Sequence, residues 1–191
     1  MGSGFQTFTA GSVLTASEVN NYLMEQTVMS FATAAARASA VTAPETGQVY
    51  WDQALFTLNV YNATNWVCIS PQAAYASGST GLQTNTTYAA HTGAAVSVLT
   101  GTKALVTVSA ATMAHNTCDI FHGFAVSGAT TVAASDAKAT SFGNGSGATG
   151  GTGVFYVTGL TAGTNTFTTQ ERCTANNYTI SDRYISVVGI A

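Results

Sequence analysis

The runs Lys103–Met113 (KALVTVSAATM) and Cys118–Gly128 (CDIFHGFAVSG) decide the fold class of this chain. Both are rich in β-branched and aromatic residues, and turn-forming Gly, Asn, Ser and Thr lie between such runs. Further runs of the same kind occur at intervals of roughly 10–15 residues, at Ala94–Thr100, Gly151–Leu160, Asn165–Cys173 and Arg183–Ala191. This spacing predicts a jelly-roll-like antiparallel β-sandwich over residues 91–191.

A second, smaller β pattern precedes the sandwich. A short run at Val49–Trp51, an alternating run at Leu55–Tyr61 and a run at Trp66–Ile69 are joined by turn-forming residues. They predict a three-stranded meander, which is too small to form a stable core alone. The meander therefore needs a packing partner, and the segment in front of it is the nearest one.

That segment predicts one helix from Thr15 to Arg37. Thr15 and Glu18 match the capping-box pattern T-x-x-E, and no Gly or Pro follows before Arg37. Two packing partners stay open for its broad apolar surface, namely the sheet of its own chain, or copies of the chain and a larger assembly. For the second case, the expected oligomer or attachment interface comprises Val19, Leu23, Met24, Val28, Phe31 and Ala35.

The predicted fold is thus mostly β with one N-terminal helix. Residues 1–70 are expected to form a small α+β attachment module, and residues 91–191 the sandwich. Residues 71–90 carry no charge and no clear periodicity, so they predict a linker. The Gly-rich segment 140–153 has neither the collagen nor the phosphate-loop spacing and predicts a flexible surface loop.

The charge content excludes several classes of function. Charged residues are only 7% of the 191 residues, against roughly 25% in typical soluble domains. The net charge is −3 and the five Lys and Arg residues are scattered, so nucleic-acid binding is not expected. Polar residues interrupt the apolar segment near residues 20–26, so membrane insertion is not expected either. No signal-peptide pattern occurs, which predicts synthesis in a reducing cytoplasm.

The residues that could carry chemistry are few. His115, Cys118, Asp119 and His122 form the one cluster that resembles metal ligands, but the spacing matches no zinc pattern. No G-x-S-x-G elbow and no strand end rich in paired acids is present. No metal, no cofactor and no enzymatic activity are therefore expected.

The cysteines leave two interpretations open. A disulfide between Cys118 and Cys173 is compatible with the sequence, and so are three buried thiols that include Cys68. The aromatic residues of the meander also have two interpretations. Tyr50, Trp51 and Trp66 provide either a surface platform on which a sugar could stack, or the core of the meander.

Two stretches resemble virion proteins. The first contains F-T-A-G-x-V-L-T-A-x-x-V-N, then Y-L-M-x-Q, an Ala/Arg-rich stretch and a G-x-V…L-x-V-Y…W pattern. These elements lie at Phe8–Asn20, Tyr22–Gln26, Ala34–Arg37 and Gly47–Trp66. They resemble the N-terminal module of virion proteins, often minor tail proteins, of tailed bacteriophages that infect actinobacteria. The resemblance covers about a third of the chain and implies a module that attaches to the virion.

The second stretch is the turn L-x-x-G-x-x-x-F at Leu160, Gly163 and Phe167, with the apolar strand Ile185–Ile190. It resembles the end of the β-sandwich head in phage fibre and decoration proteins, which are usually homotrimers. The resemblance implies a homotrimeric minor tail protein, short spike or capsid decoration protein, with capsid or tail proteins as partners. The alternative is a tail-tip head that binds a receptor or a host cell-surface glycan.

Overall fold

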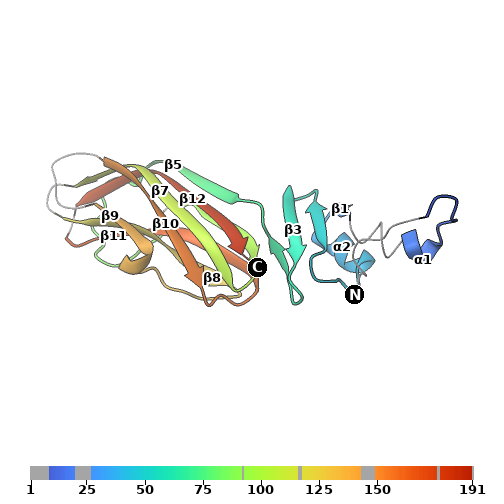
Figure 1. The fold of residues 1–191 in the computed structure, drawn as a ribbon. Coiled ribbons are helices and arrows are strands. Elements are labelled where there is room, and N and C mark those ends of the chain that lie inside the picture. Colours follow the sequence, from blue (N-terminus) through green and yellow to red (C-terminus); the bar gives the residue numbers. More distant parts are fainter. Residues whose placement is uncertain are drawn as a thin grey trace. The chain divides into compact units, whose positions relative to one another are not determined.

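The computed structural model describes residues 9–19, 27–91, 93–115, 118–142, 149–175 and 177–190 (Figure 1). The chain divides into two compact units, Met1–Ser70 and Pro71–Ala191. Each unit has its own sheets and its own buried side chains. The second unit follows the first without an intervening linker.

The first unit contains the predicted meander. The strands β2 (Val49–Asp52), β3 (Thr57–Tyr61) and β4 (Trp66–Cys68) pair antiparallel in this order. A further strand, β1 (Val28–Phe31), pairs with β2 and runs parallel to it, which completes the sheet β1-β2-β3-β4. Parallel neighbours require a crossover connection, and the helix α2 (Ala34–Ala40) lies in this one.

The prediction of a single helix from Thr15 to Arg37 is wrong. Its start is confirmed, because Thr15 and Glu18 form both hydrogen bonds of the capping box at α1 (Ala16–Glu18). Residues 20–26 lie outside the described residues, but residues 28–31 form β1 instead of a helix. The segment Thr27–Phe31 contains β-branched and aromatic residues that suit a strand, and the edge of β2 supplies its backbone hydrogen bonds. After β1 the chain forms the helix α2, where the Thr33 hydroxyl accepts a hydrogen bond from the Ala36 N–H.

Aromatic rings form the core of the first unit. Tyr50 and Trp66 are both buried, and their ring centroids lie 4.8 Å apart in an edge-on arrangement. The guanidinium of Arg37 on α2 lies 4.8 Å from the Trp66 ring centroid and 5.4 Å from that of Tyr50. This cation–π contact ties the helix to the sheet. Cys68 is buried beside them as a free thiol, and burial raises its pKa.

The second unit is an eight-stranded sandwich (Figure 1). Its strands are β5 (Gln72–Ser79), β6 (Ala95–Thr100), β7 (Lys103–His115), β8 (Ile120–Gly128), β9 (Ala139–Phe142), β10 (Thr149–Thr158), β11 (Gly163–Cys173) and β12 (Tyr178–Ile190), with a short 3₁₀ helix, η2 (Asp136–Lys138), before β9. They form two antiparallel sheets, β10-β7-β12-β5 and β6-β11-β8-β9. We call these the β7–β12 sheet and the β8–β11 sheet.

The strand order confirms the predicted jelly-roll-like sandwich. The first strand of the unit neighbours the last (β5 and β12), the second neighbours the seventh (β6 and β11), and β7 with β10 and β8 with β9 complete the series. Four strands out and four strands back therefore make one long antiparallel hairpin. Rolling up this hairpin adds the β7–β12 and β8–β11 contacts that join its two arms into sheets.

The prediction that residues 71–90 form a linker is wrong. Residues 72–79 form β5, the edge strand that pairs with β12, and Gln83 and Ala89 form isolated bridges to Tyr178 and Glu171. The Ala, Ser and Gly residues of this segment have little intrinsic strand preference. The pairing with β12, which lies far along the chain, decides its conformation.

The predicted Gly-rich loop over residues 140–153 is also shorter than expected. β9 extends to Phe142 and β10 begins at Thr149, while residues 143–148 lie outside the described residues. A Cβ atom at Gly151 would overlap the Phe142 ring. This glycine therefore allows close packing between β10 and β9, which belong to opposite sheets.

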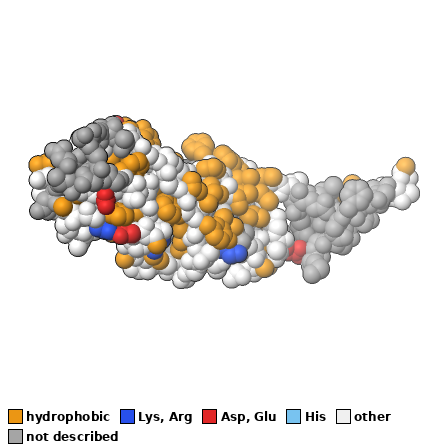
Figure 2. Space-filling model, turned by 60° about the vertical axis from the view of Figure 1, so that its left-hand side comes forward, with side chains coloured by type: hydrophobic (Ala, Val, Ile, Leu, Met, Phe, Trp, Pro, Cys, Tyr) orange, Lys and Arg blue, Asp and Glu red, His pale blue; other side chains and the backbone are white. Residues whose placement is uncertain are grey.

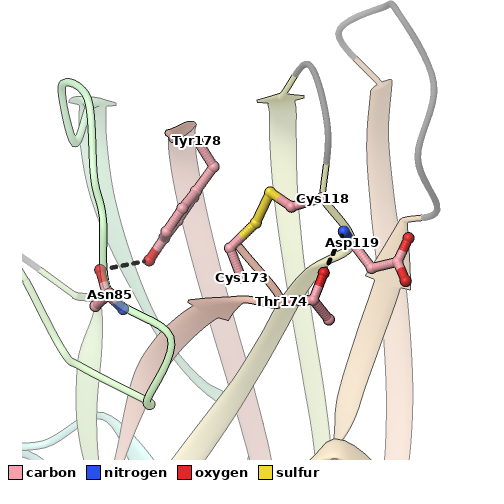
Figure 3. The surroundings of a disulfide bond; sticks show 6 residues. All are labelled: Asn85, Cys118, Asp119, Cys173, Thr174 and Tyr178. Carbon is pink, nitrogen blue, oxygen red and sulfur yellow. Dashed lines mark hydrogen bonds between the residues drawn. A yellow bond between two sulfur atoms is a disulfide. The ribbon is translucent and has the colours of Figure 1, made fainter. Parts of the chain in front are cut away.

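A disulfide joins Cys118, two residues before β8, to Cys173 at the end of β11 (Figure 3). This decides between the two interpretations of the cysteines. The bond is buried among apolar side chains, with Met113, Ile120 and Tyr178 around it. Its sequence separation of 55 residues corresponds to a stabilisation of about 4 kcal/mol in the chain-entropy model. Close by, the Tyr178 hydroxyl donates to Asn85 Oδ1 over 2.8 Å, which fixes the connection after β5.

Candidate interaction surface

The β7–β12 sheet has an outward face on which apolar side chains gather. Strand pairing places its outward residues in rows: Tyr156, Leu105 and Val188 in one row; Val154, Thr107, Ser186 and Ala73 in the next; Thr152, Ser109, Tyr184 and Tyr75 in a third; and Thr158, Lys103 and Ile190 at one end. We call this surface the apolar face. Inward residues such as Val106, Val108 and Val187 alternate with it and form the sandwich core.

The large side chains of the apolar face are well exposed. The exposed fractions are 60% for Val154, 59% for Tyr156, 52% for Tyr75, 44% for Tyr184 and 39% for Leu105. Figure 2 shows hydrophobic side chains gathered on the surface of the protein, with few charged ones among them. Large contiguous apolar patches are uncommon on monomers and mark interaction sites.

The tyrosines at one edge of the apolar face hold each other in place. Tyr75 and Tyr184 are opposite each other on β5 and β12, and their rings stack with centroids 4.4 Å apart. The Tyr75 hydroxyl donates to Asp182 Oδ1 over 2.8 Å, and this hydrogen bond raises the pKa of Tyr75 to about 12. The Tyr75 hydroxyl is therefore neutral at physiological pH.

A shallow hollow of about 270 Å³ lies beside this tyrosine pair. Small side chains form much of it, and the lining includes Ala73, Ala74, Thr107, Ser109 and Ser186. Because Ala73 and Ser186 share a row with Val154, the hollow and the exposed Val154 lie at the same level of the sheet. The apolar face thus combines an exposed apolar edge on β10 with a recess next to β5.

The outward face of the β8–β11 sheet has a different character. Its central strand β11 presents Thr164, Thr166, Thr168, Gln170 and Arg172 in alternation. The hydroxyls of Ser97 and Thr166 lie 2.8 Å apart. Hydroxyl and amide groups of this kind are well hydrated, so this face suits contact with water.

An ion pair lies at the end of this hydroxyl-rich face. Arg172 donates from Nε to Asp136 Oδ1 over 2.8 Å and from Nη2 to Oδ2, and its guanidinium lies 4.2 Å from the Phe121 ring centroid. The Tyr88 hydroxyl donates to Asp136 Oδ1 over 3.1 Å. The hydrogen bond from Arg172 lowers the pKa of Asp136, so the carboxylate stays charged at neutral pH.

Among the described side chains of the sandwich, three of charged type are fully buried. His122 on β8 and Glu171 on β11 are paired in the sheet, and their Nδ1 and Oε1 atoms are 3.4 Å apart. Arg183 on β12 brings its Nε within 3.9 Å of the same oxygen and donates from Nη1 to the Ile180 carbonyl. None of these side chains is accessible to solvent. The buried cluster is thus a feature of the core and is closed to a substrate.

Cys118, Asp119 and His122 do not come together as a metal site, and the side chain of His115 lies outside the described ones. Cys118 is bonded to Cys173, and His122 faces Glu171 instead of Cys118 or Asp119. Within the described ranges, no group of three His, Cys, Asp or Glu side chains is arranged to hold a metal ion.

The sugar platform suggested for Tyr50, Trp51 and Trp66 is wrong for Tyr50 and Trp66. Both side chains are buried in the first unit, and Trp51 is half-buried. These rings supply the core of the meander, which is the other interpretation.

The residues predicted for an interface helix do not form one stripe. Val19 follows α1 and is half-buried, while Leu23 and Met24 lie outside the described residues. Val28 and Phe31 lie on β1, and Ala35 lies on α2. The helical stripe is therefore wrong for the described members, although Val28 is exposed on an edge strand.

The apolar face was not predicted, although one signal in the sequence indicates it. The run Tyr184–Ile190 (YISVVGI) is apolar at outward as well as inward positions. Strands that are apolar on both sides are expected to be covered on both sides. The opposite sheet of the sandwich covers the inward side of this strand and leaves its outward side open.

No protein-family model matches this chain, and no curated protein matches its sequence. Among the residues that the structure describes, no helix is long and apolar enough to cross a membrane. The function is therefore inferred from the residues and their geometry.

Proposed function

We propose that this chain is a non-enzymatic structural protein of a bacteriophage virion. It acts as a homotrimer on the virion surface, as a minor tail protein, short spike or capsid decoration protein, and it attaches through residues 1–70. The observation that carries this proposal is the apolar face. A disulfide-linked jelly roll with one hydroxyl-rich face and one apolar face is suited to assembly with other protein surfaces.

The first unit supports an attachment role. The segment that resembles phage attachment modules folds into a separate unit, in which the G-x-V…L-x-V-Y…W pattern forms β2, β3 and β4 around Tyr50 and Trp66. β1 lies at the edge of this sheet with Val28 exposed. An edge strand with exposed apolar side chains can pair with or pack against a partner on the virion.

The environment of the reactive side chains supports a non-enzymatic role. Cys118 and Cys173 are joined, and His122, Glu171 and Arg183 are buried in the core. His91 is exposed, and its ring nitrogen lies 2.8 Å from the Asn85 amide oxygen in a cluster that fixes a loop. Each of these reactive side chains therefore has a contact that stabilises the fold.

The composition of purified virions tests the proposal. Antibodies against the full chain should detect it in particles purified from the phage whose genome encodes it. A capsid decoration protein is expected in hundreds of copies per particle and a tail protein in few, and quantitative gel densitometry separates the two. If purified particles lack the chain, the virion role is wrong.

A receptor- or glycan-binding head is the second candidate. The hollow beside the stacked Tyr75 and Tyr184 rings combines aromatic groups with the hydroxyls of Ser109 and Ser186, a combination that sugars can use. The full chain should then bind host cell-wall extracts, and Tyr184→Ala should lower this binding. If neither the protein nor its oligomer binds such extracts, this candidate is wrong.

A further inference from the structure

We infer that copies of this chain meet through the apolar face, with the β7–β12 sheets of three copies packed around a three-fold axis. This arrangement rests on the proposed homotrimer and names the surface that builds it. The occupant of the apolar face is thus a second and a third copy of the same chain.

The chemistry of the apolar face selects this partner. Leu105, Val154, Val188 and Ile190 share the face with the tyrosines, and aliphatic side chains offer no hydrogen bond to a sugar or a phosphate. They gain stability when another apolar surface removes them from water. The same face of another copy is such a surface. Lys103 lies at one end of the face and Asp182 beside the other, so both lie outside the rows that carry Leu105 and Val154.

The dimensions of the sheet fit a three-fold arrangement. Four strands spaced by about 4.8 Å make a face roughly 19 Å wide. Three such faces that close a triangular prism place each sheet roughly 5–6 Å from the axis, about half the ~10 Å that separates packed sheets. The outward side chains of three copies would therefore fill the centre of the prism without a gap.

The two edges of the apolar face complement each other. In a three-fold ring, the β10 edge of one copy meets the β5 edge of the next. The exposed Val154 on β10 then faces the hollow beside Ala73, since both lie in the same row of the sheet. An exposed aliphatic group opposite a recess lined by small residues is the geometry of a packed interface.

The extent of the face suits a small interface. From Lys103 to Ser109 the rows span roughly 20 Å, so the projected area is roughly 400 Å² per copy and roughly 1,200 Å² for three copies, at the lower end of the range for specific interfaces. In a ring, each copy uses this area toward two neighbours at once. The hydroxyl-rich face of the β8–β11 sheet then stays in contact with water.

The solution mass of matched lysine variants tests the inference. Leu105→Lys and Val154→Lys place a charge at exposed positions of the apolar face, and Leu99→Lys places one on the outward side of the β8–β11 sheet. By light scattering on the full chain, the wild type and Leu99→Lys should give about three times 19.5 kDa, and the two face variants 19.5 kDa. Circular dichroism should be the same for all, because no buried side chain changes.

Several results would overturn the inference, and each has a distinct meaning. Face variants that keep the wild-type mass exclude the apolar face as the interface but leave the homotrimer intact. A wild-type mass of twice 19.5 kDa excludes the three-fold arrangement. A wild-type mass of 19.5 kDa excludes both the interface and the homotrimer, whereas the virion role is then judged from purified particles alone. Face variants that keep their mass but lose binding to cell-wall extracts assign the face to a glycan.

A milder variant covers the case in which a lysine variant fails to fold. Tyr156→Ser removes an exposed ring and leaves a side chain that strands tolerate. It should raise the protein concentration at which the trimer dissociates by about tenfold or more. An unchanged dissociation concentration would overturn the inference.

Discussion

At the residue scale, the buried cluster of His122, Glu171 and Arg183 is the costliest feature of the sandwich. Charged groups lose their hydration when they are buried, and only a close partner of opposite charge offsets this loss. Glu171 is the one acidic member, and it lies near both His122 and Arg183. Removing it would leave Arg183 in the core without this carboxylate.

We therefore expect Glu171→Ala to lower the free energy of unfolding by roughly 3–5 kcal/mol. The triple variant His122→Leu, Glu171→Leu, Arg183→Met should recover most of this loss, because apolar side chains then replace the whole cluster. Gln170→Ala, on the outward side of the same strand, is the matched control and should change stability by less than about 0.5 kcal/mol. Urea unfolding of the four proteins measures this. A Glu171→Ala protein as stable as the control would contradict the account of the cluster.

The ion pair of Arg172 and Asp136 predicts a pH dependence. The pKa of Asp136 is lowered in the folded protein, so its contribution is fully present above the unfolded value of about 3.9 and is lost as the pH falls through the folded value. Asp136→Asn should therefore lower stability at pH 7 by less than about 1 kcal/mol, because the pair is partly exposed. The difference between the two proteins should shrink as the pH falls below about 4.

Urea unfolding at a series of pH values measures this difference. In an Arg172→Gln background, the effect of Asp136→Asn and its pH dependence should largely disappear. A difference that grows toward low pH would show that Asp136 does not act through this ion pair.

At the scale of elements, regular patterns were predictable, whereas the edge strands β1 and β5 were not. In β7, β8, β11 and β12, inward and outward residues alternate because each strand has one buried side and one outward side. This pattern can be recognised from neighbouring residues alone. β1 and β5 are edge strands whose hydrogen bonds come from β2 and β12. Their sequences are compatible with a helix and with a linker, and only the tertiary pairing selects the strand.

The position of the candidate site was less predictable for the same reason. Tyr75, Tyr156 and Tyr184 lie on three different strands, and they share a face only because β12 lies between β5 and β7 and β10 lies beyond β7. No local sequence pattern indicates this order of strands in the sheet. By contrast, the jelly-roll class followed from the number and spacing of the runs.

The contact of Arg37 with Tyr50 and Trp66 predicts an effect confined to the first unit. Arg37→Gln should lower the stability of this unit by about 1 kcal/mol, because the cation–π contact between α2 and the sheet is lost. Both tryptophans of the chain, Trp51 and Trp66, lie in the first unit, so tryptophan fluorescence reports its unfolding. The sandwich transition, followed by circular dichroism, is the internal control and should not change. A shift of both transitions, or of neither, would contradict this role of Arg37.

At the scale of the whole molecule, the chain combines a small unit that resembles phage attachment modules with a jelly roll that has two unlike faces. The hydroxyl-rich face suits water, whereas the apolar face requires a partner. If copies supply that partner, the tyrosines and aliphatic side chains become the centre of the assembly. The low charge of the chain then serves close contact between identical surfaces.

Cross-linking at the centre of each face tests this claim most directly. Thr107 lies on the outward side of β7 in the apolar face, and Thr166 lies on the outward side of β11 in the opposite sheet. With a short bismaleimide, Thr107→Cys should give covalently linked copies on a denaturing gel, while Thr166→Cys should stay at 19.5 kDa. Equal cross-linking of both variants, or cross-linking of Thr166→Cys alone, would contradict assembly through the apolar face.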